Sequence, residues 1–204
     1  VGAPGRFTGA VTFLGYVLFF KEDCLLKLFG TKPSNYQISQ TNCRGVQQGS
    51  EKSLVIVNET LYYKSPVDVV SYDGGLPSSI SEALGNVAYR NAVAGCINGK
   101  YYIHMQTAAG ENRVFCYDVE HGLWSREDDV QVTAFYCKNG DGYMVMADAS
   151  VLKMEPDGVT AGREGLSERW WAETGMIGIG ELNAKYLNRF QLRVWLPEGS
   201  TMTV

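Results

Sequence analysis

The chain has 204 residues and a formal net charge of −4 at neutral pH. Hydrophobic residues make up 45% and charged residues 20%, which excludes a disordered chain, and the slightly acidic balance excludes a general attraction to nucleic acid. This length allows one large all-β domain or two smaller domains. The 23 glycines and 12 tyrosines, against six prolines, favour strands joined by tight turns.

Four segments of the chain share one pattern: an apolar run, a short turn, an aromatic-rich run, a second turn and an alternating run. Their aromatic runs contain Phe19, Tyr62, Tyr101 and Tyr143, which are 43, 39 and 42 residues apart. Repeats of about 40 to 50 residues with several strands per unit are typical of β-propellers. We therefore expect an all-β, propeller-like array of four-stranded units over residues 1–160, with a plain β-sandwich as the alternative. The units are expected near residues 7–40, 50–84, 90–128 and 130–155.

Dipeptides suited to tight hairpins mark the first turn of each unit. Asn98-Gly99 and Asp141-Gly142 favour the positive φ angles that a two-residue hairpin requires. Asn58-Glu59 and Gly15-Tyr16 occupy the same place with less suitable residues. We expect each pair to connect the first two strands of its sheet.

The polarity of the runs predicts how each unit is arranged. In a radial array the inner strands are apolar on both sides, as Leu54–Val57 and Ala92–Ile97 are. A more polar outer strand is expected at Tyr36–Gln40 and at Leu123–Arg126. The main helical signal is a single turn at Ser79–Leu84, with a serine cap at its start.

The repeat pattern ends near residue 155, which predicts a domain boundary. Residues 155–167 contain Pro156 and three glycines and few large apolar residues, so we expect a flexible joint there. Residues 168–204 are expected to begin a C-terminal β-sandwich that is truncated at residue 204. Because the chain opens with Val1-Gly2 and closes inside an alternating pattern, we expect it to be a fragment of a longer protein.

The strongest strand signal of the second domain lies between residues 188 and 196. Phe190, Leu192, Val194 and Leu196 alternate with polar residues, which predicts a half-buried strand. A helix is the alternative, because Tyr186, Phe190 and Val194 are spaced by four. Four large residues outside the repeats are the candidate interface residues. They are Trp170, Trp171, Trp195 and Phe190.

The histidines and the repeated aspartates do not form a catalytic pattern. His104 lies in an apolar strand run and is expected in the core, and His121 is expected in a turn. Asp73 and Asp118 each follow a tyrosine at matching places of two units, which favours turn caps over a unique catalytic acid. We therefore predict no catalytic residue.

No metal or cofactor site is predicted. The five cysteines include no C-x-x-C pair, so we expect small buried apolar side chains. Asn139-Gly-Asp141 lacks the further carboxylates that calcium requires. The glycines of Gly175–Gly180 are not followed by the lysine of a phosphate-binding loop.

Several of these segments resemble a known family. The run Ser53–Tyr63, together with Gly99-Lys-Tyr-Tyr and Gly122–Glu127, resembles repeat units of structural proteins from tailed phages and prophages. Trp171–Gly175 and Arg189–Arg193 resemble the start of the β-sandwich that often follows. The family comprises propeller-containing tail or connector proteins, including the stabilisation proteins, and the resemblance covers roughly residues 50 to 200.

The resemblance implies a non-enzymatic structural role. Such a protein would be part of the virion, assembled in the bacterial host cytoplasm, and would bind copies of itself and neighbouring tail proteins. It implies no cofactor, no direct contact with nucleic acid and no membrane. The alternative is a propeller that binds or hydrolyses surface glycans, with Asp118, Glu127 or Asp129 as the acid.

Overall fold

The computed structural model describes residues 4–154, 189, 191–194 and 201–202. The chain divides into two compact units, Val1–Met154 and Glu155–Val204, and the fold below is that of the first unit. In the described residues all regular structure is β-strand, apart from three short 3₁₀ turns. No helix of this described part is long and apolar enough to cross a membrane. The chain is all-β, as its sequence predicts.

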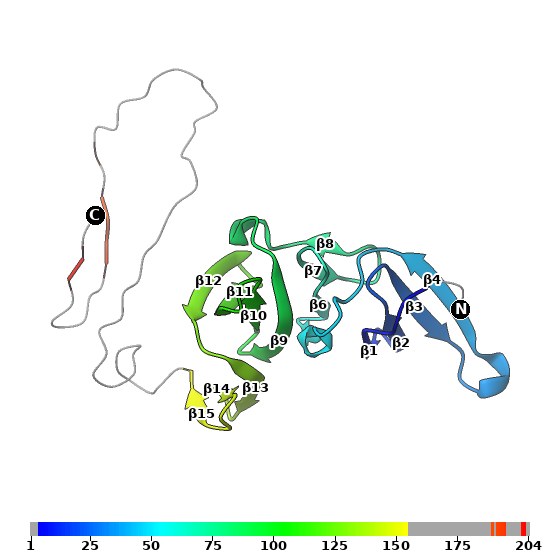
Figure 1. Ribbon diagram of the computed structural model, residues 1–204. Coiled ribbons are helices and arrows are strands. Elements are labelled where there is room, and N and C mark those ends of the chain that lie inside the picture. The colour runs from blue at the N-terminus through cyan, green and yellow to red at the C-terminus, as the bar shows by residue number, and fades with distance from the viewer. Residues whose placement is uncertain (1–3, 155–188, 190, 195–200, 203–204) are drawn as a thin grey trace, which may run out of the picture. The chain divides into compact units, whose positions relative to one another are not determined.

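The strands of the first unit form four small antiparallel sheets, and in each sheet the strands lie side by side in chain order (Figure 1). The first sheet contains β1 (Gly9–Phe13), β2 (Tyr16–Phe20), β3 (Cys24–Phe29) and β4 (Gln37–Asn42). The second contains β5 (Val55–Val57), β6 (Thr60–Lys64), β7 (Val69–Tyr72) and β8 (Ser78–Ser79). The third contains β9 (Tyr89–Ile97), β10 (Lys100–Thr107), β11 (Asn112–Asp118) and β12 (Leu123–Asp128), and the fourth contains β13 (Val132–Lys138), β14 (Asp141–Met146) and β15 (Val151–Lys153).

Each sheet coincides with one of the four units expected from the repeat. The aromatic residues Phe19, Tyr62, Tyr101 and Tyr143 all lie in the second strand of their sheet. The fourth sheet has three strands within the described residues, where four were expected. No closed or propeller arrangement is detected among residues 4–154, so the structure supports four consecutive sheets and not the finer propeller prediction.

The first hairpin of every sheet is a two-residue turn with both residues at positive φ. The turns are Leu14-Gly15, Asn58-Glu59, Asn98-Gly99 and Asn139-Gly140, with φ between 46° and 89°. Two expected turns were therefore misplaced. The first lies one residue earlier than Gly15-Tyr16, and the fourth lies two residues earlier than Asp141-Gly142, whose residues belong to β14.

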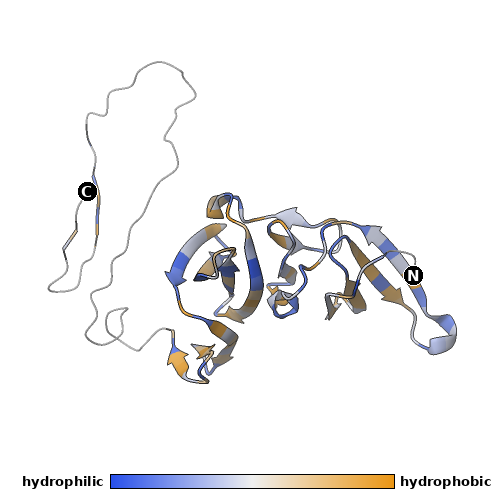
Figure 2. Cartoon of the chain, in the orientation of Figure 1, coloured by the Kyte–Doolittle hydropathy of each residue, from blue (hydrophilic) through white to orange (hydrophobic). Residues whose placement is uncertain are grey.

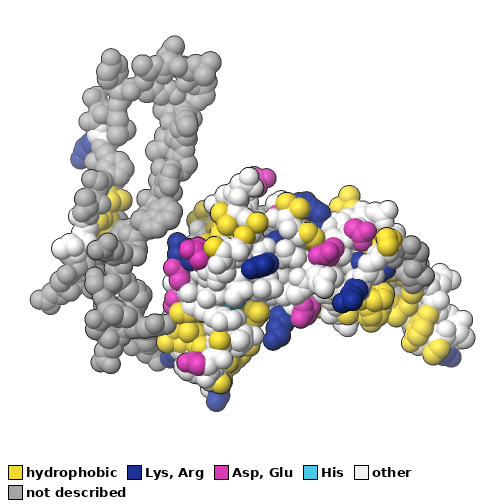
Figure 3. Space-filling model, in the orientation of Figure 1, with side chains coloured by type: hydrophobic (Ala, Val, Ile, Leu, Met, Phe, Trp, Pro, Cys, Tyr) yellow, Lys and Arg dark blue, Asp and Glu magenta, His cyan; other side chains and the backbone are white. Residues whose placement is uncertain are grey.

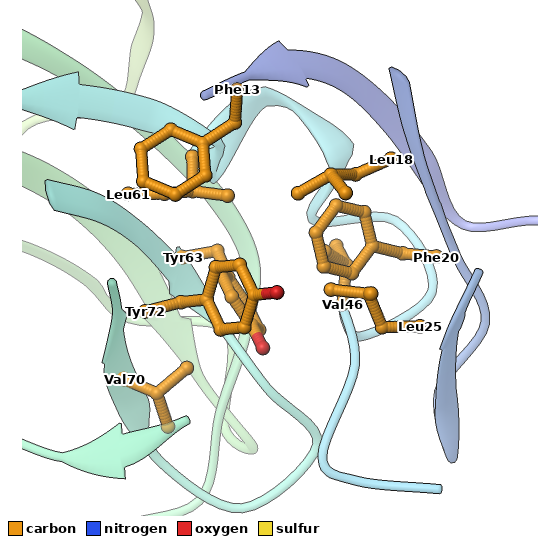
Figure 4. Packing of buried hydrophobic residues seen from close by; sticks show 9 residues of the cluster. All are labelled: Phe13, Leu18, Phe20, Leu25, Val46, Leu61, Tyr63, Val70 and Tyr72. Carbon is orange, nitrogen blue, oxygen red and sulfur yellow. The ribbon is translucent and has the colours of Figure 1, made fainter. Parts of the chain in front are cut away.

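Consecutive sheets pack face to face through apolar side chains. Figure 4 shows the first of these cores, in which the first and second sheets meet. Its aromatic centre is the pair Phe20 and Tyr63, whose ring centroids are 5.2 Å apart. The members are Phe13, Leu18, Phe20, Leu25, Val46, Leu61, Tyr63, Val70 and Tyr72. Further clusters join the second sheet to the third and the third to the fourth.

Alternation along the second strands assigns each side chain to one neighbour. Each sheet has two faces. The following face is the one that faces the next sheet in the chain, or would do so in the fourth sheet, and the preceding face is the opposite one. Tyr62 packs against the third sheet and thus lies on a following face, whereas Tyr101 packs back against the second sheet. Phe19 is on the preceding face of its sheet and Tyr143 on the following face, because Phe20 and Met144 point the other way. The four repeated aromatics therefore lie in equivalent strands but not on equivalent faces.

The connection between the first two sheets is also anchored to the third. The Ser50 hydroxyl accepts a hydrogen bond from the Ala92 amide at 3.0 Å, and the Tyr101 hydroxyl donates to the Ser53 carbonyl at 2.9 Å. Both serines are fully buried. These bonds fix β9 and β10 relative to the connection.

The strand polarities agree only in part with expectation. The outer strands β4 and β12 are more hydrophilic than the strands they flank, as predicted (Figure 2). The inner strand β5 is not buried on both faces, because Ile56 is 42% exposed. The expected helical turn is a 3₁₀ turn at Glu82–Leu84 ended by Gly85, and Ser81 accepts a hydrogen bond from Val69 in place of capping the turn.

Most of the predicted second domain lies outside the described residues, including the joint at residues 155–167. Residues 191–194 fall within the strand expected around Phe190, but they carry no strand and are exposed. Leu192 is 50% exposed, so the half-buried face predicted from alternation is not present in these residues. A strand requires a hydrogen-bonded neighbour, and the sequence pattern alone cannot supply one.

Candidate functional site

The two histidines occupy the structural positions that their sequence context predicts. His104 lies in β10, is 3% exposed, and its Nε2 is 3.0 Å from the Asn112 side-chain oxygen. Burial lowers the pKa of His104, and its Nδ1 is buried without a hydrogen-bond partner. His121 is exposed in the turn between β11 and β12, beside Asp118. His104 is therefore a core residue and His121 a turn residue.

The repeated aspartates cap turns. The Asp118 carboxylate accepts hydrogen bonds from the Glu120 and His121 amides, each at 3.1 Å. The amide and the ring of His121 hold the pKa of Asp118 down to about 2. Asp73 accepts from the Gly75 amide at 3.0 Å, and Asp148 from the Ser150 amide at 2.9 Å. This local use is what their repeated placement predicts.

Arginine side chains pair with Asp129, the last carboxylate of the acidic run at the end of the third sheet. The Arg126 guanidinium donates to the Asp129 carboxylate at 2.6 and 3.0 Å, and Arg113 lies 3.6 Å from the same carboxylate. Glu127 accepts from the Ser125 hydroxyl at 2.5 Å. Within the described residues, no three His, Cys, Asp or Glu side chains come together as a metal site.

The cysteines are free thiols, and the prediction that they are buried is confirmed for only some of them. Cys137 is exposed on β13, whereas Cys24 and Cys116 are buried. Burial raises the pKa of Cys116 to about 11, so this thiol is protonated at neutral pH. The described cysteines thus include one exposed thiol and at least two inert ones.

The sequence-predicted interface residues cannot be placed in this fold. Trp170, Trp171, Trp195 and Phe190 all lie outside the described residues. The candidate surfaces that the structure shows belong to the first and fourth sheets. One face of each has no neighbouring sheet within residues 4–154.

The preceding face of the first sheet is open and apolar. A cavity of about 850 Å³ lies on it, lined largely by β1, β2, β3 and β4 and by residues 48–51. Phe7 at its edge is 60% exposed and packs edge-on against Phe19, and Ile38 is 51% exposed. Thr8 also lines the cavity, is 8% exposed, and its hydroxyl has no hydrogen-bond partner. The cavity thus has aromatic and aliphatic walls, and the Thr8 hydroxyl oxygen is buried beneath its surface.

The following face of the fourth sheet is the second open surface. Tyr136 and Tyr143 are cross-strand partners, and their rings stack at 4.9 Å with an angle of 11°. Tyr136 is 40% exposed and Val151 is 53% exposed. Hydrophobic side chains gather over β13–β15 and over the first sheet in the space-filling view (Figure 3).

Sequence reasoning missed both open faces. Phe19 and Tyr143 belong to the predicted repeat, yet each lies on a face that has no neighbouring sheet among the described residues. No signal in the sequence marks these faces, because the second strands of all four units are apolar at both parities, as Val17 and Leu18 illustrate. Comparison with known proteins adds no relative, because no protein-family model matches the chain and no curated protein matches its sequence.

Proposed function

We propose that this chain is a non-enzymatic structural component of a tailed-phage or prophage virion. It would act in the tail or connector, after assembly in the host cytoplasm, by binding copies of itself and neighbouring tail proteins. Its four sheets would form part of a propeller-like array. No cofactor or nucleic acid is needed for this role.

One observation carries the proposal. Four sheets of the same design pack in succession, and the two sheets at the ends of the series each present an apolar face. A repeated module with open apolar faces is suited to protein assembly, because such faces gain stability when a partner covers them. The use of Asp118, Asp129 and His121 in local turns and ion pairs also supports a structural role.

Particle composition tests the proposal directly. The coding sequence is deleted from the phage or prophage that carries it, and particles are separated on a density gradient. We expect the chain to be present in purified wild-type particles and the deletion to yield incomplete or unstable tails, with complementation restoring them. Intact infectious particles from the deletion strain would refute a structural role.

A glycan-binding or glycan-hydrolysing protein is the second candidate. The cavity on the first sheet combines aromatic side chains with Gln48 and Glu51, which is a combination found in carbohydrate sites. A glycan array with a hydrolysis readout separates the candidates. Binding that is lost in Phe19→Ala would favour a lectin, and cleavage lost on substitution of Asp118, Glu127 or Asp129 would establish a glycosidase.

A further inference from the structure

The three junctions between sheets follow one rule. In each, the following face of one sheet meets the preceding face of the next, and an aromatic residue from each side lies at the contact. The pairs, with the distances between ring centroids, are Phe20–Tyr63 at 5.2 Å, Tyr62–Tyr101 at 5.3 Å and Tyr102–Phe135 at 6.3 Å. The same kind of contact is therefore built three times with different residues.

Tyrosine hydroxyls add a polar element to these junctions. The Tyr63 hydroxyl donates to the Arg44 carbonyl at 2.7 Å, and the Tyr101 hydroxyl donates to the Ser53 carbonyl at 2.9 Å. A tyrosine buried at a junction thus brings its ring to a neighbouring apolar surface and its hydroxyl to an oxygen atom.

The first and fourth sheets each present one face of the kind that forms these junctions, and within residues 4–154 no sheet packs on either face. The fourth sheet presents a following face with Tyr143, at the strand position that Tyr62 and Tyr102 hold in their sheets. The first sheet presents a preceding face with Phe19, at the strand position of Tyr63. No closed arrangement is detected within residues 4–154, and the apolar clusters of this part join only consecutive sheets.

We propose that the occupant of each open face is a second copy of this chain, bound head to tail. The fourth sheet of one copy packs on the first sheet of the next, which continues the junction already made three times within the chain. The stacked pair Tyr136 and Tyr143 enters the cavity beside Phe19.

This contact joins unlike surfaces, so it differs from the single self-complementary contact of an isologous dimer and continues until a ring closes or a chain grows. The inference rests on the proposed function, because it specifies how such a structural protein would bind copies of itself. Its test is made in solution with the full chain and no other virion protein. A failure there leaves the particle test unaffected, and a failure of the particle test leaves the solution result standing.

Sedimentation velocity over a concentration series is the first measurement. We expect the weight-average mass of the full chain to rise with concentration to at least two copies. Ile38→Lys blocks the first-sheet face and Tyr136→Lys blocks the fourth-sheet face, both at exposed positions. Each variant alone should weaken association by about 30-fold or more, as loss of an interface hot spot does. Leu76→Lys, at a 66% exposed site in the loop between β7 and β8, is the matched control and should associate like the wild type.

Mixing the two blocked variants gives the decisive result. Each retains the face that the other has lost, so an equimolar mixture should form a one-to-one dimer that stops growing. Normal far-ultraviolet circular dichroism of each variant keeps the test independent of misfolding. A wild type that stays monomeric over the series would overturn the proposal, and so would a Tyr136→Lys variant that associates as strongly as the wild type, because that result means pairing of like faces.

Discussion

At the end of β6, Lys64 carries its side chain into the protein interior. The residue is 1% exposed, and its ammonium donates to the Ser65 carbonyl at 2.5 Å. Burial lowers the pKa of Lys64 to about 8, although the Asp68 charge opposes the shift. An unfolded lysine titrates near pH 10.4, so between about pH 8 and pH 10.4 the unfolded chain binds this proton more tightly than the folded chain. The buried Lys64 charge therefore lowers the free energy of unfolding by its full amount below the folded pKa, and this loss shrinks as the pH rises.

We predict that the free energy of unfolding rises by about 1 to 3 kcal/mol between roughly pH 7 and pH 9.5 through Lys64 alone. Lys64→Met keeps the aliphatic volume and removes the buried charge, so it should remove this rise and stabilise the protein near pH 7. Urea unfolding of both proteins at several pH values measures the difference. Lys52→Met, at an exposed position, is the control and should follow the wild type. Parallel curves for Lys64→Met and the wild type would contradict the assignment.

At the scale of elements, the strands were predictable and the turns only in part. Period-two alternation and aromatic runs are local properties, so they located all four units. In Asn139–Gly142, however, two dipeptides suit a hairpin, and local chemistry does not choose between them. Packing decides, because a Cβ at Gly142 would lie 2.6 Å from the Ile97 side chain, which places this glycine in β14 against the third sheet. Which neighbour a strand face contacts is likewise a tertiary property, so the sequence pattern placed Phe19 and Tyr143 in the correct strands but did not show which sheet face each one occupies.

The first hairpins of the first and third sheets have the same turn geometry but different residues at the first turn position, so we predict opposite effects of exchanging these residues. Leu14 holds a φ of 50° in the first turn, where Asn98 holds 49° in the third. A left-handed residue other than glycine or asparagine costs about 1 kcal/mol. Leu14→Asn should therefore stabilise the protein by about that amount, and Asn98→Leu should destabilise it similarly. Thermal unfolding compares the two, and an equal sign for both changes would contradict the shared turn geometry.

The junction between the third and fourth sheets depends on a missing side chain. A Cβ at Gly95 in β9 would lie 2.4 Å from the Phe135 Cβ in β13. Gly95→Ala should therefore separate the two strands and destabilise the fold by about 1 to 3 kcal/mol. Gly75→Ala is the control, because its nearest contact would be at 3.4 Å and its φ is not positive. Chemical denaturation should show a much smaller change for the control than for Gly95→Ala.

At the scale of the whole molecule, each sheet is stabilised mainly by packing against its neighbours in the chain. Each apolar cluster joins neighbouring sheets, and the connection at Ser50 and Ser53 adds hydrogen bonds to the third. This organisation also explains why the open faces could not be predicted. A run such as Val17–Phe20 is apolar at both parities, but only the packed fold shows which parity has a neighbour.

Successive packing predicts that damage at one end stays near that end. Phe20, at 0% exposure, centres the core between the first two sheets, and Met144, at 4%, packs the fourth sheet on the third. Phe20→Ala should cost about 3 to 5 kcal/mol and Met144→Ala about 2 to 5 kcal/mol. Because arrays of this kind are coupled mainly between nearest neighbours, amide exchange should accelerate most in β1–β8 for Phe20→Ala and most in β13–β15 for Met144→Ala. Hydrogen exchange read by mass spectrometry maps both patterns, and uniform acceleration in both variants would mean that the four sheets unfold as a single unit.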